Sequence, residues 1–112
     1  MAEHTVDHTA DGTTLTLRPV DELVVTLPVN PLTGALWRVA SYDRDSVVLV
    51  AESIDEVEPG AMGAGGTLSR FRFRAVAPAR CELVIELRRG SEPAEEVPTY
   101  RLRLDITEGV RA

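Results

Sequence analysis

Cysteine is almost absent from this sequence, since Cys81 is the only one among 112 residues. A disulfide within the chain is therefore excluded, and side-chain packing must stabilise the folded state. The sequence also has no run of roughly 18 apolar residues, which a transmembrane helix needs, so we expect no membrane partner. Residues 1–4 lack the basic and apolar regions of an export signal. The sequence fits a cytoplasmic protein or a mature exported form, and leaves the compartment open.

Lysine is absent as well, so all 12 basic side chains are arginines. They stand against 18 acidic residues, which gives a formal net charge of −6 at pH 7. An acidic chain is a poor ligand for the phosphate backbone, so we expect no nucleic-acid partner. Aromatic residues make up only 4% of the chain, but the apolar fraction of 44% is ordinary for a globular domain. A chain of this length forms one domain with a core of its own.

The sequence contains no recognisable catalytic set. An enzyme needs a nucleophile, an acid–base pair or a metal site. Cys81 alternates with leucines in a strand-like run, which is typical of a buried, inert thiol. His4 and His8 have a spacing that could bind a metal on a helix, but they lie in a threonine-rich segment where a solvated terminus is the better interpretation. The sequence therefore predicts no enzyme, no cofactor and no metal site.

Alternation of apolar and polar residues with a period of two dominates the chain and predicts β-strands. The clearest case is the run in which Phe71 and Phe73 alternate with arginines. Strands are expected at residues 13–18, 22–27, 36–42, 47–54, 68–76, 80–88 and 99–107. This pattern predicts an all-β, immunoglobulin-like sandwich of two sheets, with about seven to eight strands, no disulfide and Trp37 as a core aromatic. We expect residues 1–12 to form an N-terminal segment, which can be flexible, and residues 13–112 to form the single domain.

Three connections between the expected strands are longer and richer in proline and glycine than the others. They follow the second, fourth and sixth expected strands and correspond to the B–C, D–E and F–G loops of an immunoglobulin-like sandwich, which emerge at one end. In the B–C loop, Pro31 fixes its own φ and holds Asn30 extended, while Gly34 permits a positive φ. Long loops clustered at one end of a small domain are typical of a binding edge.

Two loop motifs resemble those of the chagasin-like family of cysteine peptidase inhibitors. The first is Asn30-Pro31-Leu32-Thr33-Gly34 followed by Trp37, and the second is Gly63-Ala64-Gly65-Gly66. The resemblance covers roughly residues 12–107, and it includes Gly-Gly-Thr before the fifth expected strand and Ala-Val-x-Pro before the sixth.

This resemblance implies a protein that reversibly blocks a papain-like cysteine peptidase, its partner, without covalent chemistry. We expect a monomer, which is the default for an inhibitor that binds through loops at one edge. The three loops would form a wedge in the active-site cleft, with the B–C loop nearest the catalytic residues of the peptidase. The residues that would bind the peptidase are Asn30, Pro31, Leu32, Thr33, Gly34, Met62, Gly63, Ala64, Gly65, Gly66, Arg89 and Gly90.

The sequence departs from the family pattern at Leu32, at Ala35 and in the F–G loop. Family members typically carry threonine where Leu32 stands and an aromatic residue where Ala35 stands. The F–G loop lacks the Arg-Pro-Trp of the family; Arg89 can match its arginine, but Gly90 and Ser91 follow. Aromatic anchors often dominate the energy of an interface. A second hypothesis therefore stays open, namely an immunoglobulin-like recognition or adhesion module without inhibitory activity.

Overall fold

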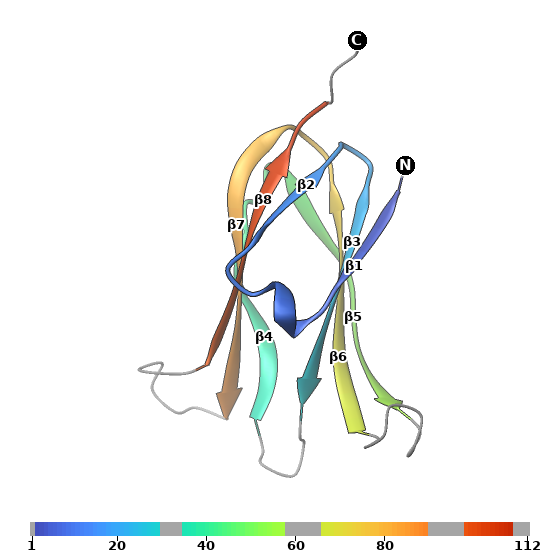
Figure 1. Cartoon of the computed structure of the whole chain (residues 1–112), viewed down its shortest axis with the longest axis vertical. Coiled ribbons are helices and arrows are strands. Elements are labelled where there is room, and N and C mark those ends of the chain that lie inside the picture. The colour runs from blue at the N-terminus through green and yellow to red at the C-terminus, as the bar shows by residue number, and fades with distance from the viewer. Residues whose placement is uncertain (1, 30–34, 58–65, 90–97, 109–112) are drawn as a thin grey trace.

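The computed structural model describes residues 2–29, 35–57, 66–89 and 98–108 (Figure 1). In this part of the chain the strands are β1 (Glu3–Val6), β2 (Thr14–Leu17), β3 (Glu22–Val29), β4 (Ala35–Ser41), β5 (Val47–Val57), β6 (Gly66–Ala75), β7 (Ala79–Arg89) and β8 (Thr99–Ile106). A single 3₁₀ turn, His8–Ala10, lies between β1 and β2. No helix of the described residues has the length and apolar character to cross a membrane.

The strands form two sheets of four strands each, with the orders β1-β3-β6-β5 and β2-β8-β7-β4. The short strands β1 and β2 pair in parallel with β3 and β8, and the other neighbours are antiparallel. The two sheets pack against each other as the two layers of a sandwich (Figure 1). The expected all-β, immunoglobulin-like fold is confirmed, and each of the seven expected strands appears with its ends shifted by at most a few residues.

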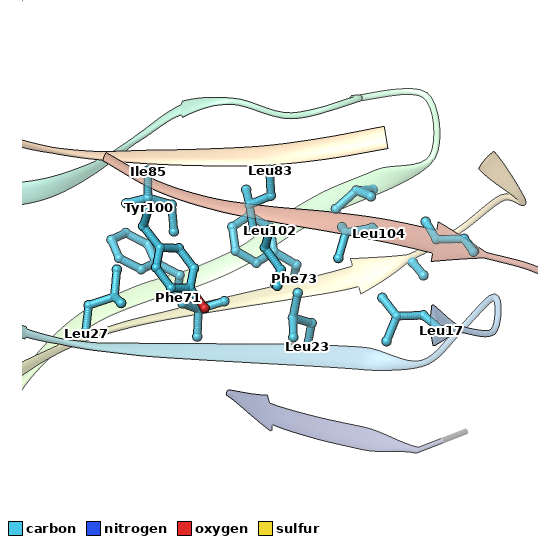
Figure 2. Close-up of a cluster of buried hydrophobic side chains, with 14 residues drawn as sticks. Leu17, Leu23, Leu27, Phe71, Phe73, Leu83, Ile85, Tyr100, Leu102 and Leu104 are labelled. Carbon is cyan, nitrogen blue, oxygen red and sulfur yellow. The ribbon is translucent and has the colours of Figure 1, made fainter. Parts of the chain in front are cut away.

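The core lies between the two sheets, where side chains from both point toward one another (Figure 2). Leu23 of β3 lies beside Phe73 of β6 in one sheet, and Leu83 of β7 lies beside Leu102 of β8 in the other. Each of these side chains is at most 1% exposed. The period-two pattern produces this arrangement because alternate residues of a strand face opposite sides of its sheet. Burial of such side chains contributes about 1.5–3 kcal/mol each, which replaces the missing disulfide.

The arginines of β6 cover the outer face of the first sheet, as the alternation predicts. Arg72 donates hydrogen bonds to Glu3 and Glu22 at 2.7 and 2.5 Å, and Arg74 donates to Glu22 at 2.9 Å. The bonds from Arg74 and then Arg72 hold the pKa of Glu22 below its usual value. These ion pairs connect the neighbouring strands β1, β3 and β6, and they neutralise the positive charges of Arg72 and Arg74.

The N-terminal residues differ from the expectation, because β1 is a strand and not a solvated terminus. Its pairing with β3 is completed by Asp21, whose side chain is 7% exposed. The Asp21 carboxylate accepts hydrogen bonds from the backbone N–H groups of Ala2 and Arg18, each at 2.9 Å, and lies 3.1 Å from His4 Nε2. Sequence periodicity missed β1 because Val6 is the only apolar residue of this strand, so no alternation of apolar and polar residues is visible.

We expect the substitution Asp21→Asn to lower the free energy of unfolding by about 2 kcal/mol at pH 7, because an amide replaces a charged acceptor of two backbone donors. The bond from Arg18 is the main cause that lowers the pKa of Asp21 below 3.8. The stabilising effect of the carboxylate is therefore complete above pH 3.8 and is lost as the pH falls through the folded-state pKa. Urea unfolding at pH 7 and about pH 2 measures this difference.

The control is Asp105→Asn, since Asp105 is 36% exposed and lies 3.7 Å from a largely exposed Arg80. This substitution should change stability by less than about 0.5 kcal/mol. Equal effects of the two substitutions, or an Asp21 effect that survives in acid, would contradict the role given to Asp21.

Candidate functional site

The strand pairs β3 and β4, β5 and β6, and β7 and β8 are each connected at the same end of the sandwich, which is the lower end in Figure 1. The strands that lead into these three connections end at Val29, Val57 and Arg89, and the strands that follow begin at Ala35, Gly66 and Thr99. The pairing brings these ends together. Val29 lies opposite Thr67 in one sheet, and Ala35 lies opposite Arg89 in the other. We call this end the loop edge.

Most of the residues proposed from the sequence lie outside the described residues: Asn30, Pro31, Leu32, Thr33, Gly34, Met62, Gly63, Ala64, Gly65 and Gly90. The structure places the backbone of the other two. Gly66 begins β6 and pairs with Val57, and Arg89 ends β7 and pairs with Ala35. The described residues thus fix where each of the three segments leaves the sandwich and where it returns.

Trp37 lies at the base of the loop edge, and its position differs from the core position expected of it. The ring is half-buried and packs against the rim of the core cluster. Its indole Nε1 donates a hydrogen bond of 2.8 Å to the carbonyl oxygen of Pro28, at an exposed position. Because Pro28 lies in β3 and Trp37 in β4, this bond joins the two sheets. The sequence indicated an aromatic residue here but not its bond to the opposite sheet.

The F–G connection is also closed at its base. The backbone N–H of Leu87 donates to the carbonyl oxygen of Pro98 at 2.9 Å. Next to this bond, Arg88 Nη1 donates a hydrogen bond of 2.8 Å to Glu86 Oε1 on the same strand. Both side chains are partly buried, with 30% of Arg88 and 23% of Glu86 exposed. The side chain of Arg88 is therefore engaged within β7.

The lone thiol lies at the opposite end of the sandwich and is not activated for catalysis. Cys81 Sγ is 3.8 Å from Ser46 Oγ, and that hydroxyl donates to Asp43 Oδ2 at 2.8 Å. Burial raises the pKa of Cys81; the hydrogen bond with Ser46 opposes this with a smaller effect, and the charge of Asp43 adds the smallest one, which again raises the pKa. A reactive thiolate is stabilised by a positive charge, and none of the groups that shift the pKa of Cys81 is positively charged. The described residues also bring no three metal-ligating side chains together.

Comparisons with known proteins agree with this architecture. The family model described as chagasin family peptidase inhibitor I42 matches residues 16–106. Among solved structures, the cysteine protease inhibitor EhICP2 from Entamoeba histolytica is similar with a TM-score of 0.82 and 22% identity, over 95% of this chain and 96% of that chain. Amebosin is similar with a TM-score of 0.69 and 21% identity, over 94% of this chain and 98% of that chain.

A third similar structure is PbICP-C, solved in complex with falcipain-2. Its TM-score is 0.59 and its identity 16%, over 94% of this chain and 89% of that chain. At these identities the solved structures show a shared fold. No curated protein sequence matches this chain.

The low reactivity expected of the Cys81 thiol can be tested by alkylation. In the folded protein we expect iodoacetamide to alkylate Cys81 at least about tenfold more slowly than in the urea-unfolded protein at pH 8, because burial limits both access and ionisation. Mass spectrometry after timed quenching gives both rates, and glutathione in the same two solutions corrects for the effect of urea on the reagent. A folded-state rate equal to the unfolded one would show an accessible, activated thiol.

Proposed function

We infer that this chain, which belongs to the chagasin family of peptidase inhibitors, inhibits papain-like cysteine peptidases by filling their active-site cleft with the loop edge. It acts as a protein ligand and not as an enzyme. The observation that carries this proposal is the convergence of the three connections at one end of a rigid sandwich. No chemical step is required of the inhibitor, since occupation of the cleft alone excludes substrate.

The roles of individual loop residues follow from the family motifs. Residues 30–34 form the centre of the wedge, with Met62 to Gly66 on one flank and Arg89 and Gly90 on the other. Pro31 limits the conformations of the central loop, so less entropy is lost when it docks. The glycines at positions 63, 65 and 66 have no side chain to hold the two backbones apart, so backbone groups of inhibitor and peptidase can pair as strands do.

The size of the wedge is adequate for a specific complex. A standard inhibitor interface buries about 800 Å² on each partner, and three adjacent loops at the end of a sandwich offer a surface of this order. The family resemblance implies that the inhibition is reversible and that non-covalent contacts alone hold the complex together.

The departures from the family motif at Leu32 and in the F–G loop affect target choice more than the mode of binding. Leu32 presents a branched apolar side chain where a hydroxyl is typical, which favours a cleft whose centre is apolar. The F–G loop carries glycine and serine in place of an aromatic anchor, and the loss of such an anchor can cost 2 kcal/mol or more. We therefore expect weaker inhibition than from a relative with the complete Arg-Pro-Trp motif.

Steady-state kinetics with papain and cathepsin L tests the proposal directly. Increasing amounts of the protein should raise the apparent KM for a fluorogenic peptide and leave kcat unchanged, because inhibitor and substrate compete for one cleft. We expect an inhibition constant below about 1 μM, which corresponds to roughly 8 kcal/mol of binding free energy. Activity that persists at high micromolar inhibitor would reject the proposal for these enzymes and favour the recognition-module hypothesis.

Charged substitutions locate the binding surface. Thr33→Glu and Gly65→Glu should each raise the inhibition constant at least about tenfold, a loss of 1.4 kcal/mol, because a desolvated carboxylate enters the interface unpaired. The matched control is Val76→Glu, which adds the same charge at an exposed position, 44% accessible, in the connection at the far end of the sandwich. Thermal unfolding monitors the fold of each variant. An unchanged inhibition constant in both loop variants would contradict the loop assignment.

A further inference from the structure

We propose that Trp37 is a positioning residue for inhibition, and that it acts by holding the ends of β3 and β4 in the geometry that the peptidase binds. This inference rests on the proposed function. It gives Trp37 a role beyond packing, through one specific bond, from the indole N–H to the carbonyl oxygen of Pro28.

The bond lies where it can control the central segment of the loop edge. Pro28 is the residue before the end of β3, and Trp37 is two residues after the start of β4. Only residues 30–34 connect Val29 to Ala35, and these two residues belong to different sheets. Hydrogen bonds of the ladders act within a sheet and do not set the separation of the two strand ends. The indole bond of 2.8 Å joins them directly.

Among the described residues, the end of β3 has fewer ladder partners than its middle. Pro28 lies opposite Leu68 of β6, but a proline has no N–H, so the pair cannot exchange two ladder bonds. On the other side of β3, the paired residues of β1 end at Val6, opposite Val25. The end of β3 is therefore less restrained by its own sheet than its middle is.

The same bond contributes little to the stability of the whole fold. It lies at an exposed position, where exchange with water makes the net gain of a hydrogen bond small. The buried cluster that stabilises the sandwich does not include Trp37, which packs against its rim. Loss of the N–H should thus leave the protein folded, while the ends of β3 and β4 sample more separations. Only a fraction of the molecules would then present the binding geometry.

Loss of the Trp37 bond should have a specific effect on the binding kinetics. When the competent fraction of an inhibitor falls, the apparent affinity falls by the same factor. The loss appears in the association rate, because the complex, once formed, makes the same contacts as before. If Trp37 instead contacted the peptidase, its alteration would raise the dissociation rate, as interface substitutions commonly do.

The chain offers an unusually clean test, because Trp37 is its only tryptophan. Replacement of tryptophan by β-(3-benzothienyl)alanine during expression keeps the bicyclic ring and substitutes sulfur for the N–H at this one position. We expect an association rate with papain reduced about two- to threefold, as the loss of one weak hydrogen bond allows, an unchanged dissociation rate and a thermal midpoint close to that of the native protein. Trp37→Phe, which also removes the donor, should show the same slower association with a lower midpoint.

Val39→Ala provides the control for stability. Val39 is a half-buried residue of β4 that packs against the same core cluster, and its truncation should lower the thermal midpoint without altering the association rate. An association rate unchanged by the benzothienyl analogue, in a preparation whose native form inhibits, overturns the inference and leaves the proposed function intact. A higher dissociation rate overturns it in favour of direct contact. A native protein that does not inhibit overturns the proposed function, and this inference falls with it.

Discussion

The packing of the two sheets against each other is the constraint on which the rest of the structure depends. Phe71 and Phe73 on one side, and Leu83 and Leu102 on the other, are almost completely buried, and no disulfide assists them. Once these inner faces are in contact, the direction of every strand is fixed, and the connections must leave from one end or the other. The loop edge is thus a consequence of strand order, and the strand ends that border it lie only a few residues from the core.

The polar interactions at the two ends of the sandwich have different roles. At the far end, Asp21 holds the start of β3 against the N-terminal strand, and Asp43 holds the turn into β5 through Ser46. These buried or half-buried groups stabilise the fold. At the loop edge, Trp37 provides an exposed bond between the sheets. An inhibitor benefits from this division, because residues at the binding end can vary with the target without loss of the carboxylates that stabilise the domain.

Much of the fold followed from the sequence, since long runs such as β6 and β8 alternate regularly enough to reveal both strand and inner face. The strand β1 did not, because its pairing depends on Asp21, a residue distant in sequence whose role only the folded chain displays. The loop motifs could be recognised because few sequences combine Asn-Pro-x-Thr-Gly, a tryptophan three residues later and a second glycine-rich motif in this order. The bond of Trp37 could not be foreseen, because an indole in a strand-like run indicates burial, and its orientation depends on how the two sheets approach each other.

The central claim is that the loop edge, and no other surface, enters the peptidase cleft. Backbone amide chemical shifts of the ¹⁵N-labelled protein, titrated with papain whose catalytic cysteine is blocked by a methylthio group, test this most directly. We expect the largest changes among the described residues at Val29, Ala35, Thr67 and Thr99, and little change at residues 18–21, 43–46 and 76–78. The largest changes at the far end, or along the outer face of either sheet, would contradict it.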